Sequence, residues 1–201
     1  DALFDILSSA IWIIQDKYIV LSFLYWVQLI KGAVIYGVVP ASGALLKTFE
    51  SMKDSEVEIE IFKEVPKQFK KYRNQRFPSF LFSFSTICLL STLYFIVKSQ
   101  FDNSLLFVVV ILYTLAIVVI LLAYYSYYVA IIGARRKDAF IYGYVAIFRN
   151  IGTSLAILLG TLLLFVIAWW NLFLFLVAAP STFFGFVYFL LTQLSHSKLD
   201  F

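Results

Sequence analysis

The stretch that most constrains this chain is residues 150–195, which contains no Asp, Glu, Lys or Arg and consists mostly of Leu, Phe, Val, Ile and Ala. As a helix rising 1.5 Å per residue, it would be roughly 70 Å long, about twice the thickness of the hydrocarbon core of a bilayer. A soluble domain of this size has too little interior to bury such a run. The stretch therefore predicts two membrane crossings joined by a turn.

The composition agrees with a membrane protein. The chain is 62% hydrophobic and 14% charged, whereas soluble domains are about 25% charged. The net charge of +4 is too small to indicate a nucleic-acid partner. The single cysteine, Cys88, lies in an apolar run and has no second cysteine with which to form an intramolecular disulfide, so we interpret it as a packing residue.

The distribution of charged residues predicts an all-α fold, a polytopic bundle in one integral membrane domain that covers residues 1–201. Five spanning helices are expected at residues 18–46, 77–97, 104–132, 151–170 and 172–194. Residues 1–16 carry apolar side chains between Asp1, Asp5 and Asp16, a spacing that predicts a helix lying in the outer interface or covering the outer face of the bundle. Residues 47–76 form the predicted cytoplasmic loop.

Lysine and arginine counts predict the orientation. Thirteen of them fall in residues 47–78, in residues 133–150 and after the last span, whereas only Lys17 and Lys98 fall on the opposite side. By the positive-inside rule, the N-terminus is expected outside and the C-terminus in the cytoplasm. The tyrosines of residues 124–128 and the pair Trp169 and Trp170 are typical of aromatic belts at the two interfaces; a ligand cage is the alternative.

Small residues at four-residue spacing predict where helices pack closely in lipid. One row in the first predicted span is Ala33, Gly37 and Ala41, and a row in the fourth is Gly152, Ala156 and Gly160. A third row repeats every seven residues, at Ala116, Ala123 and Ala130. We expect these rows to pack within the chain, although any row left uncovered is a candidate surface for another membrane protein.

The predicted loop separates its charges, being acidic over residues 50–64 and basic over residues 67–76. Ser55 and Glu58 resemble a capping box, and Pro66 suits the first turn of a second helix. That helix would form a candidate interface, whose residues are Phe62, Phe69, Tyr72, Arg73 and Arg76. Two interpretations remain open, a helix resting on anionic headgroups and an element docking on a cytoplasmic subunit.

Residues 31–45 combine three glycines with Pro40, which removes a helical hydrogen bond, so we expect a kinked or broken helix there. Lys31, predicted at membrane depth, is either a functional residue or a side chain reaching for a headgroup or carbonyl. In the next span, Ser79, Ser83 and Thr86 are expected to form hydrogen bonds between helices.

This part of the chain also resembles a known family. The residues Gly37, Pro40, Ala41 and Ala44 match the pattern Gly-x-x-Pro-Ala-x-x-Ala of the YesL-like membrane proteins of Gram-positive bacteria, and Phe69-Lys70-Lys71 precedes the next span. The family commonly has Trp where this chain has Phe49, and residues 73–77 only approximate its second pattern. The resemblance implies a protein of the bacterial cytoplasmic membrane associated with carbohydrate uptake, with no catalytic residues to carry over.

The sequence gives little support for an enzyme. His196 is the single histidine, no predicted span contains Asp or Glu, and there is no P-loop, so we expect no catalytic residue, metal or cofactor. The expected function is that of a non-catalytic accessory subunit of an ABC-type carbohydrate or glycan importer. Its expected partners are membrane lipids and permease subunits with a separate ATPase. The alternative is a small transporter or channel acting alone as a homo-oligomer.

Overall fold

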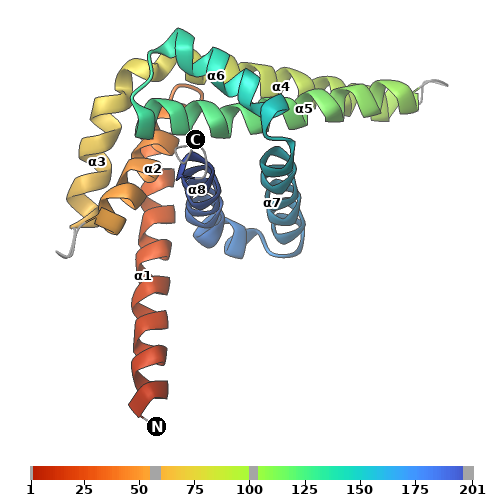
Figure 1. The fold of residues 1–201 in the computed structure, drawn as a ribbon. Helices are drawn as coiled ribbons and strands as arrows, with labels where there is room; N and C mark the ends of the chain where they lie inside the picture. The colour runs from red at the N-terminus through yellow and green to blue at the C-terminus, as the bar shows by residue number, and fades with distance from the viewer. Residues whose placement is uncertain (1, 55–59, 100–103, 197–201) are drawn as a thin grey trace.

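A computed structural model of the chain describes the backbone of residues 2–54, 60–99 and 104–196, and the side-chain surroundings of residues 17–53, 60–98 and 105–194. Within those ranges the secondary structure is helical, which confirms the predicted class. The α-helices are α1 (Ala2–Lys31), α2 (Val38–Asp54), α3 (Ile61–Tyr72), α4 (Arg76–Ser99), α5 (Ser104–Tyr127), α6 (Arg136–Arg149), α7 (Ile151–Trp170) and α8 (Leu172–His196). A 3-10 turn, Arg73–Gln75, joins α3 to α4, and a π-helix, Tyr128–Ile132, extends α5 (Figure 1).

Four helical segments of the described chain are long and apolar enough to cross a membrane. They are Ile61–Lys98, Leu105–Ile132, Ile151–Trp170 and Leu172–Leu194. The last three agree with the predicted spans 104–132, 151–170 and 172–194, and the predicted span 77–97 lies within α4. These helices indicate a membrane protein.

The predicted first span, residues 18–46, is not one helix. The chain leaves the α-helical conformation after Lys31 and resumes it at Val38, so the expected break is confirmed but the single span is wrong. Helix α1 also runs from Ala2 without the predicted boundary near residue 17. The side chains of residues 1–16 lie outside the described part, so their predicted interfacial position stays a prediction.

Helix α2 forms the centre of the core. Residues 39–46 are all buried, as are Thr48 and Phe49. Helices α1, α3 and α8 pack against it, as do α4 and α5. In the predicted cytoplasmic loop, residues 47–76, the first part continues α2, and the second part contains α3, an amphipathic helix that buries Ile61, Val65 and Phe69. The cytoplasmic position of this segment stays a prediction.

Two details of the predicted loop differ or fall outside the described residues. Helix α3 begins at Ile61 rather than near Pro66, which lies inside the helix because the apolar face starts earlier. The predicted capping box, Ser55 with Glu58, lies in residues 55–59, outside the described part. The acidic residues that are described pair locally with lysines, in the ion pairs Lys47–Glu50, Lys63–Glu60 and Lys67–Glu64.

Three of the four tyrosines of residues 124–128 are core residues and Tyr128 is half-buried against them, which corrects their assignment to an aromatic belt. Tyr124, Tyr125 and Tyr127 are at most 4% exposed. The Tyr125 hydroxyl donates to Oε1 of Gln75 at 2.9 Å, and the hydroxyl of Tyr72 on α3 donates to the Ala130 carbonyl in the π-helix at 3.1 Å. The buried phenol groups here are stabilised by hydrogen bonds to the α3–α4 junction and to the π-helix that extends α5. Tyrosine therefore suits this core, because its ring is apolar and its hydroxyl finds an acceptor.

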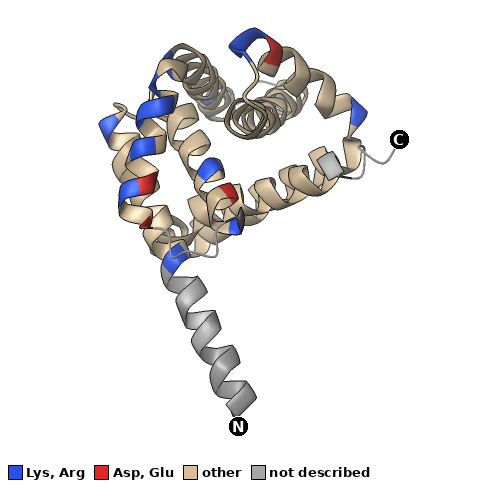
Figure 2. Cartoon of the chain, turned by 60° about the vertical axis from the view of Figure 1, so that its left-hand side comes forward, with Lys and Arg blue, Asp and Glu red and all other residues tan. Residues whose placement is uncertain are grey.

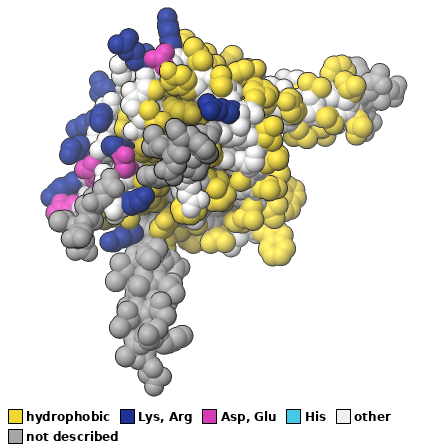
Figure 3. All heavy atoms as spheres, in the orientation of Figure 1, with side chains coloured by type: hydrophobic (Ala, Val, Ile, Leu, Met, Phe, Trp, Pro, Cys, Tyr) yellow, Lys and Arg dark blue, Asp and Glu magenta, His cyan; other side chains and the backbone are white. Residues whose placement is uncertain are grey.

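Helices α4 and α5 form a hairpin that projects beyond the other helices (Figure 1). Its surface in Figure 3 is mostly hydrophobic. Its outer half exposes large apolar side chains on both helices: Leu90, Tyr94, Phe95, Val97, Leu105, Leu106, Phe107, Val109, Val110, Leu112 and Tyr113. We call residues 87–98 and 105–113 the outer hairpin. So much apolar surface needs a hydrocarbon or protein environment.

Replacing Tyr72 by Phe tests the link between α3 and the π-helix. The Tyr72→Phe variant leaves the buried Ala130 carbonyl without this donor, so we expect a loss of about 0.5–1.5 kcal/mol of stability. The thermal unfolding midpoint in mild detergent measures it. Tyr142→Phe, on an exposed tyrosine of α6, is the control and should change the midpoint little; equal midpoints for both variants would contradict the link.

Candidate functional site at the break between α1 and α2

The break between α1 and α2, residues 32–37, is a tight reversal of the chain. The conformation of Ala33 (φ 54°) and Val34 (φ 55°) is left-handed, which is rare for residues other than glycine and most unusual for a β-branched one. Backbone hydrogen bonds hold the turn, from Val34 N–H to the Leu29 carbonyl at 2.9 Å and from Gly37 N–H to the Val34 carbonyl at 3.1 Å. Strain of this kind persists only where the surroundings impose it.

Two glycines explain how the reversal closes. A Cβ on Gly32 would collide with the Cα of Gly37, and a Cβ on Gly37 would lie 2.8 Å from the Leu29 carbonyl oxygen. The two backbones therefore touch where only glycine leaves room. Pro40 follows in the first turn of α2, a position where a helix does not need its missing N–H, so it starts the second helix rather than kinking the first.

Two serines of α4 anchor the turn. The Ile35 carbonyl accepts hydrogen bonds from the hydroxyls of Ser79, at 2.9 Å, and Ser83, at 3.1 Å. The Ser79 oxygen also accepts the N–H of Val39 at 3.3 Å. The predicted hydrogen bonding between helices is confirmed for these two serines. It is wrong for Thr86, which donates to the Phe82 carbonyl in its own helix because i−4 carbonyls lie within reach of a helical threonine.

The turn and the start of α4 line an open pocket of about 540 Å³, the turn pocket. Its lining residues are Lys31, Gly32, Ala33, Tyr36, Arg76, Phe77 and Phe80. The Tyr36 ring stacks on Phe80, with centroids 5.7 Å apart, and Phe80 stacks on Phe84. The pocket thus combines two exposed cationic side chains with a phenol and an aromatic wall, which suits an anionic group attached to an apolar body.

The structure brings together two predicted site residues, Lys31 and Arg76, that the sequence assigned to different places. Lys31 is exposed and is the last residue of α1, so it lies at the break rather than within a continuous helix, and its depth in the membrane stays a prediction. A cation also suits the negative end of the helix dipole at this position. That Lys31 and Arg76 line one pocket was not evident from the sequence, because it depends on how α3 packs and brings the start of α4 beside the turn.

The predicted interface on α3 divides into two groups. Phe69 and Tyr72 are 9% and 6% exposed, so they belong to the core and are wrong as partner contacts. Their aromatic rings pack toward α2, because that is the apolar face of the helix. Phe62, Arg73 and Arg76 are exposed. In Figure 2, the basic residues of α3 lie along one outer edge of the fold.

The motif residues behave differently from the small-residue rows. Ala41 and Ala44 are buried in α2, within the core described above. Ala33 and Gly37 lie in the break, so the row Ala33, Gly37 and Ala41 is wrong as one helical face. In the third row Ala123 and Ala130 are buried, whereas Ala116 is half-buried.

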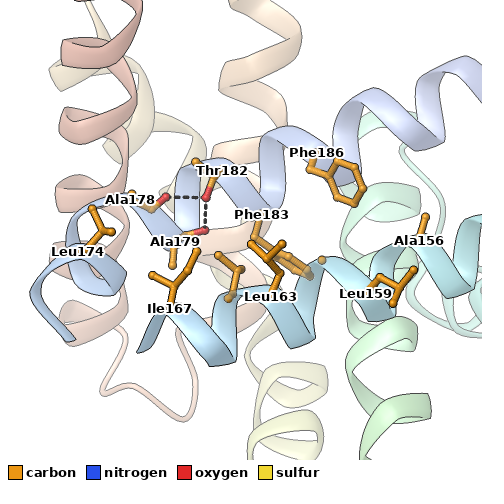
Figure 4. Close-up of a pocket in the computed structure, with 12 residues that line it drawn as sticks. Ala156, Leu159, Leu163, Ile167, Leu174, Ala178, Ala179, Thr182, Phe183 and Phe186 are labelled. Carbon is orange, nitrogen blue, oxygen red and sulfur yellow. Dashed lines mark hydrogen bonds between the residues drawn. The ribbon is translucent and has the colours of Figure 1, made fainter. Parts of the chain in front are cut away.

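The row on α7 is partly confirmed. Ala156 and Gly160 line an apolar cleft of about 580 Å³ between α7 and α8 (Figure 4). A Cβ added to Gly160 would lie 3.1 Å from the ring of Phe186 on α8. Gly152 is exposed and faces open space, so it is wrong as a packing residue in the described chain. Thr182 in the cleft donates to carbonyls of its own helix, which leaves the surface apolar.

No group of three or more His, Cys, Asp or Glu side chains that could hold a metal ion occurs among the residues whose structure is described. Cys88 is exposed on α4 rather than packed, which corrects its interpretation as a packing residue.

Comparison with known proteins found no matching family model, curated protein or solved structure.

Val34→Gly tests the strain in the turn. Glycine adopts a positive φ without the steric cost that valine meets, which is about 1–2 kcal/mol, so this variant should be more stable by about 0.5–1 kcal/mol. The matched control is Ile30→Gly, an exposed apolar residue within α1, which should be less stable by about 0.5–1 kcal/mol. Thermal unfolding in detergent measures both, and destabilisation by Val34→Gly would contradict the left-handed turn.

Ser79→Ala and Ser83→Ala test the anchor. Ser79→Ala leaves the Val39 N–H without this acceptor and should cost about 1–3 kcal/mol. Ser83→Ala should cost less, about 0.5–1.5 kcal/mol, because the Ile35 carbonyl keeps the Ser79 hydroxyl. The same unfolding assay separates them. A larger effect at Ser83 than at Ser79 would mean that the turn is held differently.

Proposed function

We propose that this chain is a non-catalytic accessory membrane subunit of a bacterial ABC-type carbohydrate or glycan importer. It packs beside the permease and aids the assembly, stability or regulation of the complex. The observation that carries this proposal is the outer hairpin, which leaves the body of the fold and exposes apolar side chains on both of its helices. The YesL-like motif in residues 37–44 supports the class of complex.

The outer hairpin has the properties of a surface that packs on membrane helices of another protein. Tyr94, Phe95 and Leu106 are each more than 60% exposed. In Figure 1, α7 runs in a different direction from α4 and α5, and large apolar side chains stay exposed both on α7 and on the outer hairpin. A permease offers the helical surface on which such a hairpin packs, through van der Waals contact between closely fitted side chains.

The charge distribution supports a cytoplasmic position for α3 and for the turn pocket. Lys63, Lys67, Lys70 and Lys71 are exposed on α3, and Lys31 lines the same pocket as Arg76. By the positive-inside rule, we assign this basic side to the cytoplasm. The end of α1 then lies near the cytoplasmic headgroups, and Phe62 on α3 is available to a cytoplasmic component.

Co-purification tests the proposal. Expressed in a Gram-positive host and extracted in mild detergent, the tagged chain should bring down a permease and an ATPase in a fixed ratio. The double variant Phe95→Ala with Leu106→Ala should lower that yield at least five-fold. The matched control, Phe165→Ala with Leu163→Ala on α7, removes side chains of the same type and similar exposure and should keep most of the yield.

Two results would contradict the subunit role. One is a chain that purifies alone under conditions that preserve other importers. The other is solute uptake by the pure protein in liposomes, which would favour the alternative of an oligomeric transporter acting alone. Equal losses in both double variants would instead show that the contact is not specific to the outer hairpin.

A further inference from the structure

A second groove lies between α4, α5 and the start of α6, on the other side of Phe77 from the turn pocket. Its volume is about 720 Å³, and we call it the α6 groove. Its lining residues are Phe77, Pro78, Leu81, Phe82, Ser85, Val118, Leu121, Tyr125, Arg136, Lys137, Phe140 and Ile141. Apolar side chains thus form most of its wall, and the two cations come from consecutive positions at the start of α6.

We propose that the α6 groove binds an anionic phospholipid, with acyl chain against the apolar wall and phosphate at Arg136 and Lys137. Charge complementarity argues for this occupant: a mostly apolar lining that includes two cations matches an amphiphile with a negative headgroup. Basic pockets between membrane helices on the cytoplasmic side are known to suit such headgroups. A zwitterionic lipid such as phosphatidylcholine also carries a phosphate, but its own choline cation neutralises that charge, so it matches two protein cations less well.

The electrostatics of the groove are favourable beyond the two lining cations. Arg135 precedes them, and all three stand at the N-terminus of α6, where the helix dipole also favours an anion. The acidic residue in this first turn, Asp138, is not part of the groove lining. Figure 3 shows basic side chains and one acidic one gathered at this end of the fold, beside hydrophobic surface.

Arg136 and Lys137 differ in how they are held. The guanidinium of Arg136, a lining residue of the groove, donates to the Asn74 carbonyl in the α3–α4 junction, which restrains it. Lys137 is exposed and extends from the neighbouring position. Lys137 is therefore the better residue to mutate, since its loss should not disturb the junction.

The α7–α8 cleft provides a natural comparison. It is also apolar and of similar volume, about 580 Å³, but its lining contains no charged residue. It can accept an acyl chain without distinguishing one headgroup from another. Selectivity for an anionic lipid is thus expected from the α6 groove and not from this cleft.

The test uses the whole purified chain in mild detergent, incubated with equal amounts of dioleoylphosphatidylglycerol and dioleoylphosphatidylcholine. Native mass spectrometry counts the lipids that remain bound. The wild type should retain the anionic lipid in preference. Lys137→Gln should lower that preference about five-fold, since a cation near a headgroup contributes about 1 kcal/mol. Lys70→Gln, on an exposed lysine of α3, is the matched control and should leave the preference unchanged.

A second variant probes the wall of the groove. Ser85→Phe places a large side chain in the lining and should lower retention of the anionic lipid while Lys137 stays in place. The proposal is overturned if the wild type retains both lipids equally, if Lys137→Gln and Lys70→Gln act alike, or if glycerol 3-phosphate alone displaces the lipid. Because the experiment needs no permease, its outcome is independent of the subunit role.

Discussion

The fold depends on satisfying backbone groups where the chain stops being helical. Residues 32–37 break the helical ladder next to α4, and the half-buried Ile35 carbonyl would cost about 1–3 kcal/mol if it were left unpaired. Ser79 and Ser83 supply donors to the Ile35 carbonyl from a neighbouring helix. This pairing allows α2 to turn back into the protein, and α2 then becomes the helix around which α1, α3 and α8 assemble.

The sequence predicted the later part of the fold well and the earlier part poorly, for a physical reason. Residues 151–170 and 172–194 form uninterrupted apolar helices whose bounds follow from length and from the absence of charge. Residues 38–54 have the composition of an ordinary amphipathic segment, and only the contacts made by the other helices put it at the centre. Tyr124 and Tyr125 were similarly ambiguous, since tyrosine suits an interface and also a core with hydrogen-bond acceptors.

The candidate site shows the same division between local and long-range information. The broken helix was predictable from Gly32, Gly37 and Pro40, whose conformational preferences are local. The meeting of Lys31 with Arg76 was not, because the two residues are separated by three helical segments and their approach depends on how α3 packs. The α6 groove likewise joins residues from three helices, and no spacing along the chain announces it.

The contact between Gly32 and Gly37 has a mechanical consequence. Because the two backbones touch and the turn is bonded to α4, the reversal has little freedom to act as a soft hinge. Helix α1 and the start of α4 are therefore expected to move together. A tilt imposed on α1, for example by a change in bilayer thickness, would be transmitted to α4 and would displace the outer hairpin.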